Sequence, residues 1–382
     1  MPGFIAGKKR CASAPFCFSD SFDQSTAKGS TSLSSKISDD ANGPILPGLP
    51  DDVAKVCLAL LPRSDIPLMG AVCKKWRSFL RSQEFFITRK QAGMLEEWIY
   101  LLVTDEEGKK SHWEVLDCLG DKQRRPPPMP CPAKAGFGVV ALDGKLYVVG
   151  GYSMLNGTKA ASTEVYQYDT CLNSWRKLAN LNVARYDFAC AEVNGMIYAV
   201  GGYRVEGESL SSAEVYSPET NKWTTIESLR RPRRGSFGFG FEKKLYVMGG
   251  RSSFTIGNSR SVDIYNAERK EWCEMKNGCV MVTTHAVIGK KLFCVEWKNQ
   301  RKLAMFYSED RSWSKEPIPL TGSSNVEFRF GILGGKLLLF SHKKAPWYAT
   351  LVYDPAAAPG SEWRTCKIKP SGECLLSVTI QA

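Results

Sequence analysis

The residue types that most often carry catalysis or bind metals are sparse in this sequence. It holds three histidines, His112, His285 and His342, which follow no common spacing. A copper or zinc centre needs several such ligands close together. The thirteen cysteines form no C-x-x-C pair, and several of them fall inside apolar segments. We therefore expect no catalytic residue, no metal and no cofactor, and cysteines that are buried in a reducing compartment.

Basic and aromatic side chains are abundant instead. The formal net charge is +12, and the run RRPRR occupies residues 230–234. Arginine mixed with aromatic residues is typical of protein-binding hot spots. A basic surface can also bind nucleic acid, but no nucleic-acid motif accompanies it here. No glycine-rich loop opens a helix as a phosphate-binding loop would, because the glycine pairs come at the ends of predicted strands.

No apolar run approaches the roughly 18–20 residues that span a membrane, and no secretory signal opens the sequence. Residues 1–44 are rich in serine, mixed in charge and without apolar periodicity, so we expect a disordered tail. The four aspartates within this tail argue against a transit peptide. We expect the protein in the cytoplasm, the nucleus or both.

The rest of the chain is organised by a repeat of about 50 residues. GFGVVALDGKLYVVGGY, DFACAEVNGMIYAVGGY and SFGFGFEKKLYVMGGR contain double glycines that recur after 51 and then 48 residues. A short strand and then a tryptophan follow each segment: Trp175, Trp223 and Trp272. Two later units, beginning with KLFCVEW and KLLLFSH, have lost the glycines and keep the other features.

Each unit predicts four short strands. Asp143-Gly144, Asn194-Gly195 and Gly334-Gly335 suit two-residue hairpin turns, in which both central residues take positive φ. Each recurring tryptophan is expected between neighbouring units, where its burial removes about 150–250 Å² from water. A row of tryptophans that stacks on sugars is the alternative, which the fixed repeat position disfavours.

This order of double glycine, tyrosine and tryptophan resembles the kelch repeat, and the resemblance implies an all-β six-bladed β-propeller over residues 98–382. WIYLLV (98–103) and HWEVLDCL (112–119) lack a first strand, which ECLLSVTI (373–380) can supply, so we expect the last strand to close the ring. The expected blades are about 98–130 plus 373–381, 136–181, 186–229, 235–277, 282–318 and 328–370.

Residues 45–90 predict a small all-α module. Pro50, Asp51 and Asp52 suit the start of a helix, and Pro62 its end. Ser64 can cap a second helix. The apolar positions of the first helix share one face, and a helical apolar pattern continues beyond the second cap: Val53, Val56, Cys57, Leu60, then Leu68, Met69, Val72, Trp76, Phe79 and Leu80.

The positions LPDD, Leu61-Pro62, Asp65, Leu68 and VCKKW resemble the F-box, and F-box followed by kelch repeats resembles a large plant family. The resemblance implies a substrate-recognition subunit of a Skp–cullin–F-box ubiquitin ligase with no catalytic centre of its own. Its partners would be a Skp-type adaptor, a cullin held through that adaptor, and a protein substrate. Carried over by position, the residues that bind the adaptor would be Leu49, Pro50, Leu68, Val72 and Trp76.

In a propeller, the loops between second and third strands and those between blades share one face, and such loops usually carry recognition. Here they are basic and aromatic, so we expect them to bind an acidic or phosphorylated segment. The expected substrate-binding residues are Tyr152, Arg185, Tyr203, Arg204, Arg233, Arg234, Arg251, Trp297, Arg329 and Trp347. Scattered solvated arginines, an interaction scaffold without ligase function and a nucleic-acid-associated propeller are the alternatives.

Overall fold

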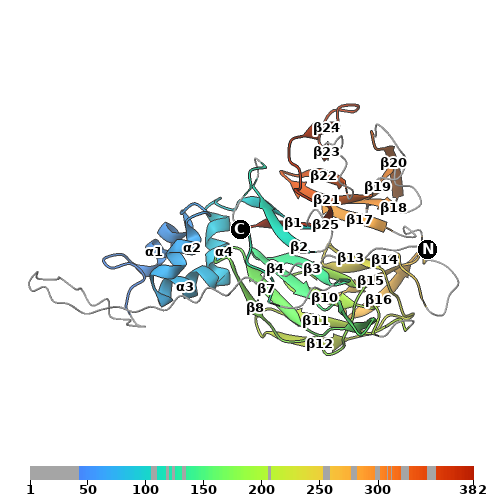
Figure 1. Cartoon of the computed structure of the whole chain (residues 1–382), viewed down its shortest axis with the longest axis horizontal. Helices are drawn as coiled ribbons and strands as arrows, with labels where there is room; N and C mark the ends of the chain where they lie inside the picture. Colours follow the sequence, from blue (N-terminus) through green and yellow to red (C-terminus); the bar gives the residue numbers. More distant parts are fainter. Residues whose placement is uncertain are drawn as a thin grey trace, which may run out of the picture. The chain divides into compact units, whose positions relative to one another are not determined.

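The structure, a computed structural model of the 382-residue chain, describes residues 43–104, 110–117, 120–122, 125–130, 135–204, 208–252, 259–276, 282–296, 302–307, 309–310, 312–319, 327–341 and 350–382. Helices come first along these residues and strands follow (Figure 1). The predicted disordered tail, residues 1–44, lies almost wholly outside the described residues. None of the helices in the described part of the chain is long and apolar enough to cross a membrane.

Four helices form the N-terminal module: α1 (Asp51–Ala59), α2 (Ile66–Val72), α3 (Lys74–Arg81) and α4 (Gln83–Gln91). α1 begins directly after Pro50, and its first turn carries two aspartates, whose charge complements the helix dipole. The expectation that Ser64 caps the second helix is wrong. Asp65 is the N-cap of α2 and makes no side-chain capping bond, because its backbone is already near-helical rather than extended.

Side-chain caps separate the last three helices. The Sγ atom of Cys73 accepts a hydrogen bond from the Trp76 amide at 3.4 Å, and Ser82 Oγ accepts one from the Phe85 amide at 3.2 Å. Cys73 therefore ends the apolar pattern of α2 and starts α3 in a new direction. The buried side chains of the module form one cluster: Ile45, Ala54, Leu58, Ala59, Ile66, Phe79, Leu80 and Phe85.

This cluster continues into the strand region through Cys171 and Ala382. Two buried arginines reinforce the junction. Arg63 Nη2 donates a hydrogen bond to Tyr100 Oη at 2.9 Å. Arg89 donates hydrogen bonds to the backbone carbonyls of Ala59 and Leu61, at the end of α1, and to that of Met94, between α4 and β1.

Six sheets confirm the predicted six-bladed β-propeller. Blade 1 contains β3 (Gly138–Leu142), β4 (Lys145–Val149), β7 (Val165–Asp169) and β8 (Ser174–Lys177). Blade 2 contains β9 (Ala189–Val193), β10 (Met196–Val200), β11 (Ala213–Ser217) and β12 (Lys222–Ile226); blade 3 contains β13 (Phe237–Phe241), β14 (Lys244–Met248), β15 (Val262–Asn266) and β16 (Glu271–Met275). Blade 4 contains β17 (Val282–Ile288), β18 (Lys291–Glu296), β19 (Lys302–Tyr307) and β20 (Ser312–Pro317); blade 5 contains β21 (Phe328–Leu333), β22 (Lys336–Ser341), β23 (Thr350–Tyr353) and β24 (Trp363–Cys366).

The closing blade, blade 6, joins the two ends of the propeller. Its order is β2-β1-β25, with β1 (Glu97–Thr104), β2 (Ser111–Leu116) and β25 (Cys374–Gln381). The chain's last strand pairs antiparallel with β1 from Glu97 to Val103, so the predicted closure is confirmed. In the fourth-strand position, the described residues show an isolated bridge between Leu116 and Lys122.

The predicted hairpin turns have positive φ values at both central residues, and the double glycines lie where a side chain would clash. Asp143 and Gly144 take φ values of 48° and 69° in the β3–β4 turn. In blade 3 the same turn is built from Glu242 and Lys243, at 45° and 58°, without a glycine. The double glycine has a steric cause: a Cβ atom on Gly201 would lie 2.3 Å from the carbonyl oxygen of Arg233 in the next blade.

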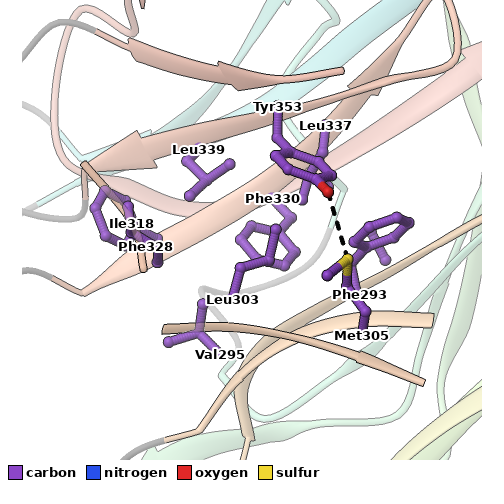
Figure 2. Packing of buried hydrophobic residues seen from close by; sticks show 11 residues of the cluster. Phe293, Val295, Leu303, Met305, Ile318, Phe328, Phe330, Leu337, Leu339 and Tyr353 are labelled. Carbon is purple, nitrogen blue, oxygen red and sulfur yellow. Dashed lines mark hydrogen bonds between the residues drawn. The ribbon is translucent and has the colours of Figure 1, made fainter. Parts of the chain in front are cut away.

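An apolar cluster fills each of the six boundaries between neighbouring blades. Figure 2 shows the one between blades 4 and 5, where Phe293 and Met305 face Phe330 and Tyr353. The repeated tryptophans add a polar link. The indole nitrogens of Trp175, Trp223 and Trp272 donate to the carbonyls of Pro127, Ala179 and Glu227 in the preceding units, at 2.8, 3.1 and 2.7 Å.

Candidate interaction surfaces

Several large apolar side chains of the helical module stay exposed. In α1, the side chains of Ala54, Leu58 and Ala59 are buried, whereas those of Val53 and Val56 are exposed. Leu68 and Val72 of α2 are 71% and 60% exposed. We call six of these exposed residues the apolar strip: Leu49, Val53, Val56, Leu60, Leu68 and Val72. The apolar face expected on the first helix thus lies mostly on the solvent side.

The residues expected to bind the adaptor divide into two groups. Leu49, Pro50, Leu68 and Val72 are exposed and lie on or beside the apolar strip. Trp76 is half-buried, and its indole nitrogen donates to the Ile45 carbonyl at 2.7 Å. Trp76 therefore holds the segment before α1 in place, and the exposed residues can be touched by a second protein.

Two arginines expected in the substrate surface are buried. Arg185 is fully enclosed. Its Nη1 atom donates to the carbonyls of Gly201 and Ser212, each at 2.9 Å, and its Nη2 atom donates to Glu214 Oε1 at 2.7 Å. Burial lowers the pKa of Arg185, and the bond to Glu214 opposes that effect. The group stays charged, because an arginine side chain is not deprotonated in proteins.

Arg233 repeats this arrangement one blade later. Its Nη1 atom donates to the carbonyls of Val247 and Ser261, and its Nη2 atom lies 2.9 Å from Asp263 Oδ2. Burial raises the pKa of Asp263, and the charge of Arg233 opposes the shift. Both guanidinium groups tie a blade-to-blade loop to the third strand of its blade. They are not accessible to a second protein, so the candidate surface is built without them.

A row of aromatic and cationic side chains crosses blades 1 to 3; its central ring, Tyr186, is buried, and its other members are half-exposed. The ring of Tyr186 lies 4.9 Å from that of Tyr152 and 5.0 Å from that of Tyr203, centroid to centroid. The Arg234 guanidinium lies 4.8 Å from the Tyr203 ring, and Lys159 Nζ lies 4.8 Å from the Tyr152 ring. We call these five residues the tyrosine–cation row; such contacts contribute about 0.5–2 kcal/mol each.

The remaining residues expected to bind substrate are more dispersed. Arg204 and Arg251 are exposed, and a backbone bridge joins Arg251 to Arg234 beside the tyrosine–cation row. Arg329 is half-buried, and its Nε atom donates to the Leu375 carbonyl at 2.9 Å, which links blade 5 to the closing strand. Trp297 and Trp347 lie outside the described residues.

The structure adds residues that the sequence reading missed. Between β4 and β7 of blade 1 stands a two-stranded hairpin, β5 (Tyr152–Leu155) with β6 (Thr158–Ala161). Met154 and Leu155 near its tip are each 61% exposed. The signal was Asn156-Gly157, a dipeptide that favours a tight hairpin turn and takes φ values of 50° and 78°.

Known proteins share both parts of this architecture. A family model for the F-box domain matches residues 46–88, and one for the Kelch motif matches residues 133–182, 184–230 and 239–278. F-box/kelch-repeat protein At1g67480 of Arabidopsis thaliana is 57% identical over 99% of this chain and 99% of its own length. Another from the same plant, At1g27420, is 40% identical over 90% of this chain and 99% of its own length. These matches show that the chain belongs to the F-box/kelch-repeat proteins.

Proposed function

We propose that this chain is the substrate-recognition subunit of a Skp–cullin–F-box ubiquitin ligase. The helical module docks onto a Skp-type adaptor and through it onto a cullin. The loop face of the propeller binds a protein substrate and presents it for ubiquitination in the cytoplasm or the nucleus. The chain itself contributes binding and placement rather than catalysis.

The apolar strip carries this proposal. Six large apolar side chains, contributed by α1, α2 and the residues next to α1, stay exposed on a module that buries a separate apolar cluster. Large apolar side chains that stay exposed in such number on a small module are typical of a protein-binding surface. Leu68 and Val72 lie four residues apart on α2, so they share one side of that helix. A partner that covers them gains affinity without disturbing the core beneath.

The loop face supports the substrate half of the proposal. Arg234 lies over the half-exposed Tyr203 ring, the exposed Arg204 follows Tyr203 in the chain, and a backbone bridge joins the exposed Arg251 to Arg234. Arginine next to tyrosine is the composition of binding hot spots. Guanidinium groups also pair with carboxylates or phosphates through two parallel hydrogen bonds. An acidic or phosphorylated protein segment is the partner class that fits this charge.

Adaptor capture tests the proposal directly. The full chain is co-expressed with a plant Skp-type adaptor, and the affinity is measured by calorimetry. We expect Leu68→Asp with Val72→Asp to weaken adaptor binding at least about 100-fold, because each charge would be desolvated in an apolar contact. The variant should melt at the wild-type temperature, since both positions are exposed.

Leu155→Asp is the matched control: it places the same charge on an equally exposed apolar site of the propeller. It should leave adaptor affinity unchanged. A chain that does not bind the adaptor, or a double variant that binds as tightly as the wild type, contradicts the ligase role and favours an interaction scaffold.

A further inference from the structure

The large apolar side chains that stay exposed in the described part of the chain fall in two places. One is the helical module, with the apolar strip and Ile87 on α4. The other is the tip of the β5–β6 hairpin, where Met154 and Leu155 stand in solvent. If the proposed function assigns the first to the adaptor, the second is available to a different partner. Exposed apolar groups beside a polar rim are typical of binding sites.

The hairpin is built as an arm with two distinct faces. Its register pairs Tyr152 with Ala161 and Met154 with Lys159. Side chains alternate across a strand, so Tyr152, Met154 and Lys159 share one face, and Leu155 lies on the other. On the first face, Lys159 Nζ lies 4.8 Å from the Tyr152 ring and 5.6 Å from the Tyr186 ring.

The tyrosine–cation row extends this face across the propeller. Equivalent backbone bridges on three blades, Ala135 to Tyr152, Tyr186 to Tyr203 and Arg234 to Arg251, hold its members in place. Successive rings and the Arg234 guanidinium are each about 5 Å apart. An extended chain covers such a row with about four or five residues.

Charge is distributed unevenly along the row. At the hairpin end, burial raises the pKa of the half-buried Asp187 carboxyl group, and the positive charge of Lys159 opposes that shift. Toward blade 3, the exposed Arg204 follows Tyr203 in the chain, and a backbone bridge joins the exposed Arg251 to Arg234. A negatively charged segment is therefore attracted most strongly to the blade 3 end, while the hairpin end offers apolar contact.

We propose that the β5–β6 hairpin and the tyrosine–cation row together bind an extended, unphosphorylated protein segment with one large apolar side chain and a nearby cluster of Asp or Glu. The apolar side chain packs on Met154, which shares a face with the row, and the carboxylates pair with Arg234 and Arg251. This inference rests on the proposed function, because it names the substrate class of the same loop face. Burial of the apolar anchor gives specificity beyond charge alone.

Selection from random 12-residue peptides displayed on phage tests this inference, with the full chain bound to the adaptor as bait. The enriched sequences should carry Leu, Met, Ile or Phe within about six residues of two or more acids, the reach of an extended segment along the row. Met154→Ser with Leu155→Ser should remove the apolar preference and keep the acidic one. Arg234→Ala with Arg251→Ala should do the reverse.

A synthetic peptide from the selection should bind each double variant about ten-fold or more weakly by fluorescence anisotropy. Lys243→Ala, on an exposed lysine of blade 3 outside the row, should bind it like the wild type. Absence of enrichment, enrichment without acids or without an apolar residue, or variants that select the same sequences overturn the inference. The Leu68→Asp variant, used alone as bait, separates the two proposals, because it should lose the adaptor and keep the peptide preference.

Discussion

The propeller and the helical module treat their apolar side chains in opposite ways. Each blade boundary of the propeller encloses a cluster of buried residues, and the hairpin tip is where large apolar groups of its described part stand exposed. The module buries a small cluster and leaves the apolar strip uncovered. A closed ring completes its own interior, whereas the module's surface is left for another protein to complete.

The arginines of the propeller also divide into a buried pair and an exposed pair. Arg185 and Arg233 are enclosed and paired with acids of their own blades. Arg204 and Arg251, which lie near them in sequence, are exposed. The buried arginines donate hydrogen bonds to backbone carbonyls at the ends of the loops that carry the exposed arginines, so they fix the position of those loops.

The largest effect should come from removing the closing strand. Deleting residues 372–382 takes away β25, which pairs with β1 over seven positions and brings Ala382 into the module's cluster. The loss exposes an unpaired strand edge and the boundary with blade 5. We expect the cooperative thermal transition to disappear and the protein to associate. Gln381→Ala, which keeps the backbone pairing, is the control. A truncated chain that stays monomeric and melts cooperatively contradicts the self-contained ring.

The second-largest loss of stability should come from breaking the buried ion pair between Arg185 and Glu214. Arg185→Met leaves Glu214 buried without its countercharge, which costs about 3–5 kcal/mol of unfolding free energy. Arg204→Met, at an exposed position, should change it by less than about 0.5 kcal/mol. Urea denaturation of the two variants measures the difference. Equal changes in the unfolding free energy of the two variants would contradict the division into buried, structural arginines and exposed ones.

A change of pH should have a smaller effect and act on the propeller alone. His285 in β17 packs against the Phe237 ring at 4.6 Å, and burial lowers its pKa from 6.5 to about 4. The unfolded chain takes up this proton near pH 6.5 and the folded chain does not, so stability falls as the pH drops below about 6.5. The expected loss is about 2 kcal/mol at pH 5.

His285→Gln should flatten the unfolding free energy between pH 7 and pH 5 in urea titrations. The described helical module, residues 43–94, contains no histidine, so adaptor affinity should not follow this titration. A variant that keeps the full pH dependence would assign the effect to other groups.

The repeat made the ring predictable. Each unit carries its own turn residues, strand pattern and tryptophan, so the sheet order, and even the pairing of β25 with β1, follows from the local pattern. The capping of α2 was not predictable in the same way. Ser64 and Asp65 are both good capping residues, and the tertiary packing of the module decides between them.

The site was predicted less well because composition does not reveal burial. Arg185 and Arg233 looked like surface charges, but each stands about 30 residues before an acid in the same blade, Glu214 or Asp263. That recurring spacing was the signal for an internal pair. Met154 and Leu155 lie in an insertion between the second and third strands of blade 1, which the repeat pattern itself does not describe. Asn156-Gly157 is the local signal that predicts a hairpin there.

One strand of blade 1 has a further consequence. β7 starts, at Val165, just after the β5–β6 hairpin and ends, at Asp169, just before Cys171, which packs into the helical module's cluster. Five residues of strand are on the order of 16 Å long. A rigid strand therefore sets the separation between the base of the hairpin and the module. Under the proposed function, this strand would keep a bound substrate at a nearly constant distance from the adaptor. Which of its lysines can meet the ubiquitin-charged enzyme would then depend on the shape of the captured protein itself.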